Sequence, residues 1–179
     1  MTFVDLFKHK LGQWGLNQKL SHQINIPPCP LTLSGTQSIA IIFTIHQTED
    51  IQSALDLKNK LIQQHNIKTQ LLGLSLNPNI TPKSLEPFLD IIFGQDLDWK
   101  HLPKLNRIAY FLNQSFDILI NIDTTNSLTL NYIAASVAAK IKIGHHHSKN
   151  QKIYSVMFDA QHHSDTLVNT IIHYLQLAT

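Results

Sequence analysis

Apolar runs alternate with amphipathic segments from residue 38 onward, and few folds accommodate such an alternation. The run SIAIIFTI at residues 38–45 is continuous and rich in β-branched residues, which is typical of a strand buried on both faces. In the segment after it, Thr48 can cap a helix, with Glu49 and Asp50 in the first turn. This pattern predicts an α/β fold with a mainly parallel sheet and helices on both faces.

The remaining segments continue the pattern. We expect further strands at residues 69–76, 88–93, 116–122 and 141–143, and helices at residues 105–114, 127–139 and 166–177. The last apolar run, residues 153–158, follows only about nine polar residues, fewer than the dozen or so that a parallel crossover needs. We therefore predict a three-layer sandwich around a sheet of about six strands, parallel except for an antiparallel last strand.

Two segments are expected to precede this domain. Residues 1–20 are predicted to form an extra amphipathic helix, because apolar residues recur at helical spacing: Phe3, Phe7, Leu11 and Trp14. Residues 21–36 contain three prolines and are expected to be an irregular connector. A single α/β domain then occupies residues 37–179.

Charge and composition argue against several classes of function. The 14 basic and 12 acidic residues give a formal charge of +2, and Arg107 is the single arginine. Nucleic acid and acidic membranes are therefore not expected partners. No apolar run reaches the roughly 18 residues of a membrane-spanning helix, and one cysteine cannot form a disulfide framework. We expect a cytoplasmic protein.

The turns that would carry cofactor chemistry lack the residues for it. Nucleotide-binding sheets enter their first helix through glycines, which let the backbone approach a pyrophosphate. Here the turn is HQTED at residues 46–50, with no glycine and two carboxylates. A Gly-x-Ser-x-Gly nucleophile motif is also missing. We predict no cofactor and assign no catalytic residue, so an enzyme is the less favoured class.

Three consecutive histidines, His145, His146 and His147, are the strongest candidates for metal chemistry. Imidazole is a common ligand of transition metals, and a second group at residues 159–163 (DAQHH) could add to the set. If the last two strands form a hairpin, however, the two groups lie about 20 Å apart, at opposite ends of a six-residue strand. Solvated loop histidines are the preferred interpretation, with His145 and His147 as weak metal candidates.

A candidate ligand site follows from the strand ends. In open parallel sheets the ligand crevice lies outside the carboxyl ends of the strands. Five polar residues are expected at that edge: His46, Asn77, Asp98, Asp123 and Thr124. The cluster DTTN at residues 123–126 also has the composition of a helix start, where side-chain oxygens accept from free N–H groups. Capping by Asp123, Thr124 or Asn126 is the favoured interpretation, and ligand binding is the alternative.

Several segments together resemble a known family. FDILINI at residues 116–122, AASVAAKIKIG at 134–144, IYSVMFD at 153–159 and DLDW at 96–99 resemble an uncharacterised family of Bacteroidota proteins, domain of unknown function 6913. The resemblance begins at about Ser38 and implies no activity; the three histidines are not part of its pattern. The segment AKIKIG at residues 139–144 is also similar to the N-terminal Rossmann-like half of heptosyltransferase-type glycosyltransferases. That similarity would imply an acceptor-side half without the nucleotide-sugar domain.

Two classes of function remain open at this point. The leading hypothesis is a non-enzymatic module that binds a protein partner through the N-terminal helix. The alternative is a domain that binds a small molecule or nucleotide sugar at the edge with His46 and Asp123. A polar pocket there with converging carboxylates and a buried, perturbed histidine would favour the alternative, whereas a flat apolar patch would favour the partner.

Overall fold

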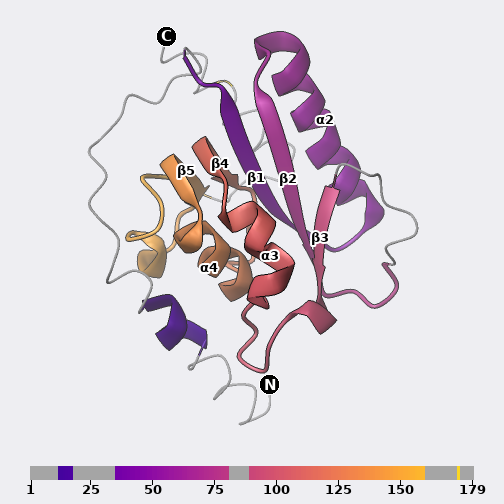
Figure 1. The fold of residues 1–179 in the computed structure, drawn as a ribbon, viewed down its shortest axis with the longest axis vertical. Coiled ribbons are helices and arrows are strands. Elements are labelled where there is room, and N and C mark those ends of the chain that lie inside the picture. Colours follow the sequence, from indigo (N-terminus) through magenta and orange to yellow (C-terminus); the bar gives the residue numbers. More distant parts are fainter. Residues whose placement is uncertain (1–11, 18–34, 81–88, 160–172, 174–179) are drawn as a thin grey trace.

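The structure is a computed structural model that describes residues 12–17, 35–80, 89–159 and 173 (Figure 1). Its strands are β1 Ser38–Ile45, β2 Lys68–Ser75, β3 Leu89–Phe93, β4 Ser115–Asn121, β5 Ala138–His145 and β6 Val156–Phe158. Its α-helices are α2 Thr48–His65, α3 Leu105–Leu112 and α4 Leu128–Ser136, and two short 3-10 helices, η2 and η3, span Gly94–Asp96 and Ser148–Asn150. The predicted α/β class is confirmed.

The six strands form one sheet in the order β3-β2-β1-β4-β5-β6, and every neighbouring pair is parallel. This is the order of doubly wound dinucleotide-binding sheets. From β1 the chain moves outward through β2 to β3, and it then returns to the other side of β1 for β4. Strands β1 and β4 are therefore the pair at which the winding direction changes.

The prediction of an antiparallel last strand is wrong. Strand β6 pairs in parallel with the end of β5, with Ile143 opposite Val156 and His145 opposite Phe158. Because β6 has only three residues, the segment between β5 and β6 must return along the strand direction by only about 10 Å. Ten residues span that distance without an α-helix. That segment contains η3, and it is tied to β5 by a hydrogen bond from Ser155 N to Lys142 O (2.8 Å).

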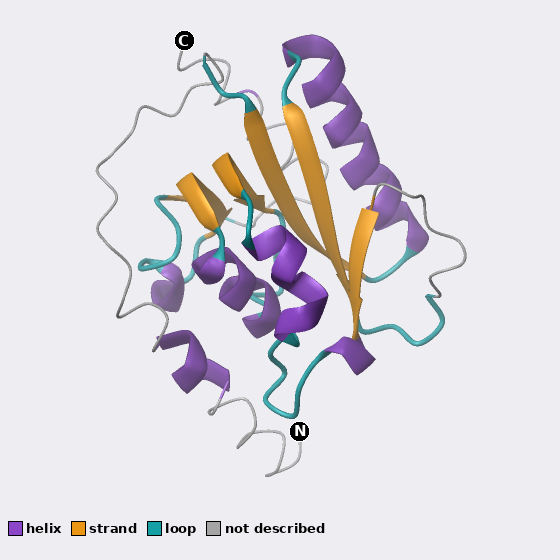
Figure 2. Ribbon diagram, viewed as in Figure 1, coloured by secondary structure: helices purple, strands orange, loops and turns teal. Residues whose placement is uncertain are grey.

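Helices cover both faces of the sheet (Figure 2), and each face carries an apolar cluster. On one face, α2 packs Ile51, Ala54, Leu57 and Leu61 against alternate residues of β1, such as Ile41. On the other face, α3 and α4 pack residues such as Ile108 and Ile133 against Ala40 and Ile42. Strand β1 is thus buried on both sides, which agrees with its uninterrupted apolar sequence.

The start of α2 differs in one residue from the expectation. Gln47, not Thr48, is the N-cap, and Asp50 in the first turn accepts hydrogen bonds from His46 N (2.8 Å) and Gln47 N (3.0 Å). These two hydrogen bonds fix the backbone of the turn between β1 and α2. The helix ends at His65, and its C-cap Asn66 has a left-handed φ of 53°, a conformation that asparagine tolerates.

Residues 12–17 are helical and pack on the α4 side of the sheet. Leu16 is buried in that cluster, and a Cβ on Gly12 would lie 2.5 Å from both Leu128 Cδ2 and Lys100 O, so only glycine allows this approach. The rest of the predicted N-terminal helix, most of the connector and the helix at residues 166–177 lie outside the described residues. The domain boundaries stay a prediction.

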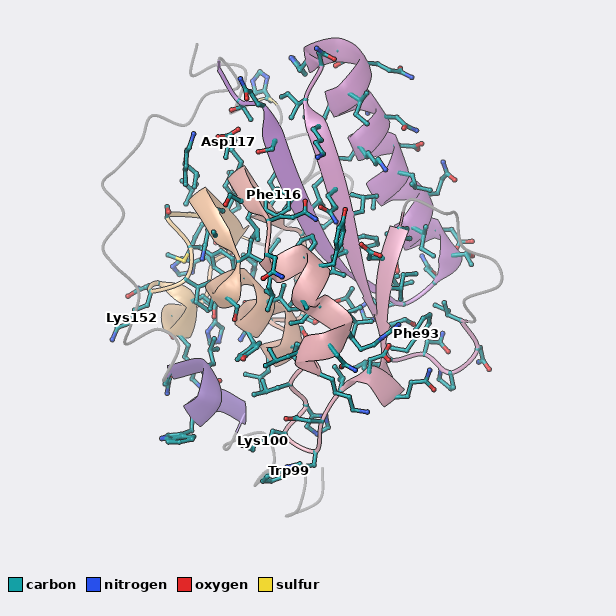
Figure 3. All side chains as sticks on the ribbon, viewed as in Figure 1. Phe93, Trp99, Lys100, Phe116, Asp117 and Lys152 are labelled. Atoms are coloured by element: carbon teal, nitrogen blue, oxygen red, sulfur yellow. The ribbon has the colours of Figure 1, made fainter. Side chains whose placement is uncertain are left out.

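Asp117 ties the amino ends of β1 and β4 together (Figure 3). Its Oδ2 accepts from Gln37 N (2.9 Å) and Ser38 N (3.0 Å), and its Oδ1 lies 2.7 Å from Lys140 Nζ. The Lys140 hydrogen bond and the two backbone donors lower the pKa of Asp117 to about 2.

No helix in the described part of the chain has the length and apolar character needed to cross a bilayer.

Lys142 should destabilise the fold at neutral pH. Its side chain is buried on β5, with one long hydrogen bond from Nζ to Ala135 O (3.4 Å), and burial lowers its pKa from 10.5 to about 8. The folded protein therefore releases this proton before the unfolded chain does, and stability should rise as the pH increases from about 8 to 10.5. Lys142→Met should be more stable than the parent at pH 7, by about 2 kcal/mol.

Urea unfolding of both proteins at intervals from pH 7 to 10.5 checks this expectation. The advantage of Lys142→Met should shrink across that range, because the parent gains stability and the variant lacks the titrating group. A difference in free energy of unfolding that does not change with pH would contradict the assigned cause.

Candidate functional site

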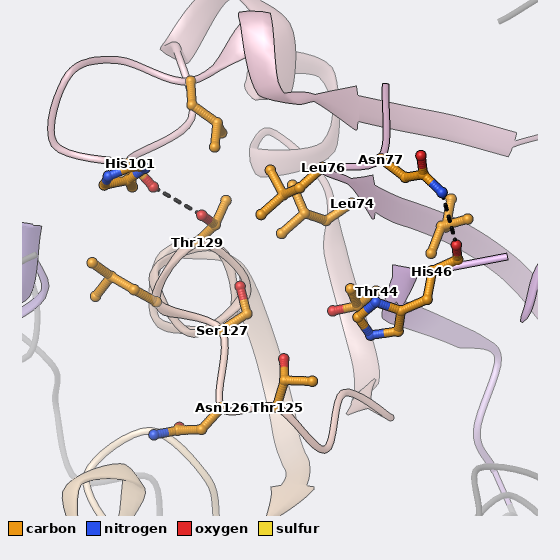
Figure 4. Close-up of a pocket in the computed structure, with 13 residues that line it drawn as sticks. Thr44, His46, Leu74, Leu76, Asn77, His101, Thr125, Asn126, Ser127 and Thr129 are labelled. Atoms are coloured by element: carbon orange, nitrogen blue, oxygen red, sulfur yellow. Dashed lines mark hydrogen bonds between the residues drawn. The ribbon is translucent and has the colours of Figure 1, made fainter. Parts of the chain in front are cut away.

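A cleft of about 700 Å³ opens at the carboxyl edge of the sheet, between the ends of β1 and β2 and the start of α4 (Figure 4). Its lining comes from four segments: Thr44, Ile45 and His46 of β1 and the turn after it; Leu74, Leu76 and Asn77 of β2 and the turn after it; Leu97 and His101; and Thr125, Asn126, Ser127, Leu128 and Thr129. The edge is therefore concave.

The position of the cleft follows from the topology. The segments that leave β1 and β4 go to opposite faces of the sheet, since α2 covers one face and α4 the other. Chains that diverge in this way leave a gap above the two strand ends, where open α/β sheets bind their ligands. Thr44 and His46 approach this gap from β1, and Ser127 approaches it from α4.

Asp123 lies directly beneath the cleft and is almost fully buried, at 3% exposure. Its Oδ1 accepts from the hydroxyls of Thr44 (2.7 Å) and Thr125 (2.6 Å) and from Thr125 N (3.2 Å), and its Oδ2 accepts from Ser127 N (2.8 Å). Four donors on two oxygens match the accepting capacity of a carboxylate. The Thr44 bond joins the end of β1 to the segment after β4.

The start of α4 is capped by Ser127, not by Asp123, Thr124 or Asn126. The Ser127 hydroxyl accepts from Leu130 N (3.4 Å), while Asp123 accepts from the Ser127 N–H itself. The N–H groups of Leu128 and Thr129 belong to the first turn and have no acceptor within the helix. This first turn lines the cleft.

The loop between η2 and α3 brings His101 to the cleft. Asp98 Oδ1 accepts from Lys100 N (2.8 Å) and Leu102 N (3.0 Å), which folds the loop into a tight turn. At its tip His101 adopts a left-handed φ of 62°, and its carbonyl accepts from the Thr129 hydroxyl (2.8 Å). Asp98 thus acts on the cleft indirectly, by shaping the loop that carries a lining residue.

A buried network of amides supports the wall of the cleft. Tyr154 OH donates to Asn131 Oδ1 and accepts from Asn121 Nδ2, both at 2.7 Å. Asn126 Oδ1 accepts from Asn131 Nδ2 and from Asn150 Nδ2, both at 2.8 Å. These bonds fix Asn126, whose φ of 58° is left-handed, at the lip of the cleft.

The hydroxyl of Tyr154 stays protonated in this network. Burial is the main cause that raises its pKa well above the usual range; the hydrogen bond from Asn121 acts in the opposite direction, and the negative charge of Asp123 raises it further. Its ring packs on β5 at Gly144, where a Cβ would lie 2.7 Å from ring atoms. Tyr154 therefore serves as a neutral donor that links β4, α4 and the segment before β6.

The structure brings some of the predicted site residues together and not others. His46 and Asn77 line the cleft and are joined by a hydrogen bond from Asn77 Nδ2 to His46 O (3.1 Å). Asp123 lies under the cleft, Asp98 lies in the loop behind His101, and Thr124 is exposed and outside the lining. The ligand-binding role of all five residues stays a prediction.

Six polar residues of the lining are outside the predicted ligand-binding set: Thr44, His101, Thr125, Asn126, Ser127 and Thr129. The sequence contains a signal for Thr44. Strand β1 is apolar from its second residue onward except at Thr44, and a polar residue so near the carboxyl end of a buried strand indicates a polar contact there. The position of His101 had none, since it depends on a loop with no periodic pattern.

The weak metal candidates lie near the end of β5. His145 is the last residue of that strand and pairs with Phe158, while His147 caps η3 by accepting at Nδ1 from Lys149 N (3.2 Å). Within the described residues, histidine, cysteine and acidic side chains form no cluster of three that could hold a metal ion. Residues 160–163 lie outside that part of the chain.

Comparison with known proteins identifies one family. A model described as "Family of unknown function (DUF6913)" matches residues 8–177. Comparison with curated proteins and with solved structures gives no significant match.

Asp123 should matter more for stability than its neighbour Thr124. Asp123→Ala leaves two backbone N–H groups and two hydroxyls without their acceptor, and it should lower the free energy of unfolding by about 3 kcal/mol. Thr124→Ala changes an exposed side chain and should stay within about 0.5 kcal/mol of the parent. Urea unfolding at pH 7 measures both, and equal stability of the two variants would refute the assigned role of Asp123.

Proposed function

The chain belongs to the family of unknown function DUF6913, and we propose that this domain binds a small organic molecule in the cleft at the carboxyl edge of its sheet. The observation that carries the proposal is the cleft itself, at the point where the winding direction changes between β1 and β4. Doubly wound sheets bind small ligands at this point because the diverging chains leave it open.

The size and lining of the cleft support this function. Its volume of about 700 Å³ lies within the range of roughly 300–1,000 Å³ that small-molecule sites occupy. The side chains of Leu74, Leu76, Leu97 and Leu128 supply apolar contact, and hydroxyl, amide and imidazole groups supply polar contact. A mixed lining of this kind orients a ligand that has an apolar body and a polar end.

The rigidity of the polar groups also favours binding. Thr44, Thr125 and Thr129 each donate a hydrogen bond within the protein, and Asn126 accepts two. These side chains are held in place before a ligand arrives, which reduces the entropy lost on binding.

A protein partner is the second candidate function, favoured by two exposed indole rings. Trp14 is 60% exposed and Trp99 is 57% exposed, and Lys100 Nζ lies 5.1 Å from the centre of the Trp99 ring. Exposed tryptophans are common in protein interfaces. If a purified partner binds here, replacing both tryptophans by serine should abolish its binding and leave ligand binding in the cleft intact.

Two leucines of similar exposure allow a direct test of the cleft. Leu76 lines it and is 61% exposed, whereas Leu105 at the start of α3 is 62% exposed and does not line it. Leu76→Trp should fill part of the cleft and weaken the binding of small molecules identified by thermal shift on the parent protein. Leu105→Trp should leave their affinity unchanged, since it adds the same ring elsewhere.

Isothermal titration of the strongest binder against the parent and both variants measures the difference. We expect at least a tenfold loss of affinity with Leu76→Trp, about 1.4 kcal/mol. Equal affinity for all three proteins would place the binding elsewhere and refute the cleft as the site.

A further inference from the structure

Internal carboxylates occupy the starts of both helices that border the change of winding direction. Asp50 accepts from His46 N and Gln47 N at the start of α2, and Asp123 accepts from Ser127 N at the start of α4. In dinucleotide-binding sheets of the same strand order, a phosphate of the ligand binds at the N-terminus of the first helix. In this chain the anion at both positions is part of the protein.

Among the described residues, no lysine or arginine forms an ion pair with Asp123. The ion pairs Arg107–Asp96 and Lys140–Asp117 do not involve Asp123, and the cleft lining includes no lysine, arginine, aspartate or glutamate. Asp123 is 3% exposed, so solvent ions screen it weakly. Its full charge outweighs the half charge of the α4 N-terminus, and the base of the cleft is therefore electronegative.

The hydroxyls of Thr44 and Thr125 lie between Asp123 and the cleft and present hydrogen-bond acceptors to it. Thr44 and Thr125 each use their single hydroxyl proton on Asp123 Oδ1, at 2.7 and 2.6 Å. A threonine hydroxyl that has donated its proton offers only lone pairs. Thr44 and Thr125 face the same space in Figure 4, and both are lining residues. They form an accepting surface in front of a buried negative charge.

We propose that the cleft selects a ligand with a primary ammonium group and an apolar body, and that it disfavours carboxylates and phosphates. The ammonium donates to the hydroxyl oxygens of Thr44 and Thr125, and Asp123 behind them supplies the opposite charge. The apolar body lies against Leu74, Leu76 and Leu128. This inference rests on the proposed function and specifies the chemistry of its ligand.

Three probes of matched shape test the inference: 2-phenylethylamine, 2-phenylethanol and 3-phenylpropanoate. Each is titrated to millimolar concentration into uniformly ¹⁵N-labelled full-length protein at pH 8, where histidine side chains are generally uncharged and the amine is still an ammonium. Shifts of the amides of Thr44, Thr125 and Ser127 report on the cleft. We expect the ammonium to bind most tightly and the carboxylate to bind at least about tenfold more weakly, because like charges repel at short range.

Three variants identify the groups responsible. Asp123→Asn should remove the preference for the ammonium over the carboxylate, and Thr44→Val should weaken ammonium binding severalfold while the charge of Asp123 remains. Asp56→Asn removes one negative charge from the exposed side of α2 and should preserve the preference. If Asp123→Asn does not fold, Thr44→Val still tests the accepting surface.

The outcomes separate this inference from the proposed function. Cleft shifts that are equal for the three probes, or strongest for 3-phenylpropanoate or for inorganic phosphate, overturn the ammonium preference and leave a ligand-binding cleft. A preference that persists in Asp123→Asn also overturns it. If no probe shifts the cleft amides of the parent protein, the result counts against the proposed function as well.

Discussion

The pairing of β1 with β4 determines where this molecule can have a site. A parallel sheet that is wound outward in two directions from its centre must send the segments after its two central strands to opposite faces. The ends of β1 and β4 then lack a covering element, while the rest of both strands is buried between α2 on one side and α3 and α4 on the other. The position of the cleft is a consequence of this winding.

Hydrogen bonds fix the positions of the chain segments at the carboxyl edge of the sheet. The Thr44 hydroxyl bonded to Asp123 and the Ile122 N–H bonded to Ile42 O (3.1 Å) hold the two strand ends together. On the far wall, Asn126 is fixed by amides from α4 and from the segment before β6. Buried polar groups with satisfied hydrogen bonds favour one arrangement, because any other leaves donors or acceptors unpaired.

The sequence predicted the centre of the fold better than its edge. Strand β1 was predicted to the residue, since a continuous β-branched run has few other interpretations. Helix α4 ends at Ser136, and β5 begins at Ala138, three residues before the predicted strand. Alanines favour a helix locally, yet pairing with β4, such as Ala138 opposite Ser115, overrides that preference. The direction of β6 was missed because the rule on crossover length assumes a strand of ordinary length.

The candidate site was predictable to the extent that it depends on strand ends. His46 is the first residue after β1 and Asn77 the second after β2, so knowledge of the strands places both at the carboxyl edge. His101 reaches the same cleft through a loop that Asp98 shapes and in which His101 itself has a left-handed φ. Neither feature produces a periodic sequence pattern. The inward orientation of Asp123 also required the structure, because an aspartate after a strand can face either solvent or the core.

The sequence offers helix capping and ligand recognition as alternatives for residues 123–126. In the structure Ser127 caps α4, and the Asp123 carboxylate contacts both the N–H of that cap and two residues that line the cleft. One oxygen of Asp123 accepts from Ser127 N and stabilises the start of α4; the other accepts from the hydroxyls of Thr44 and Thr125, which line the cleft. A loss of stability in an Asp123 variant therefore does not exclude a role in binding. A Thr44 variant separates the stability of α4 from the proposed role in binding, because the Thr44 hydroxyl contacts Asp123 from β1 and takes no part in the turn that begins α4.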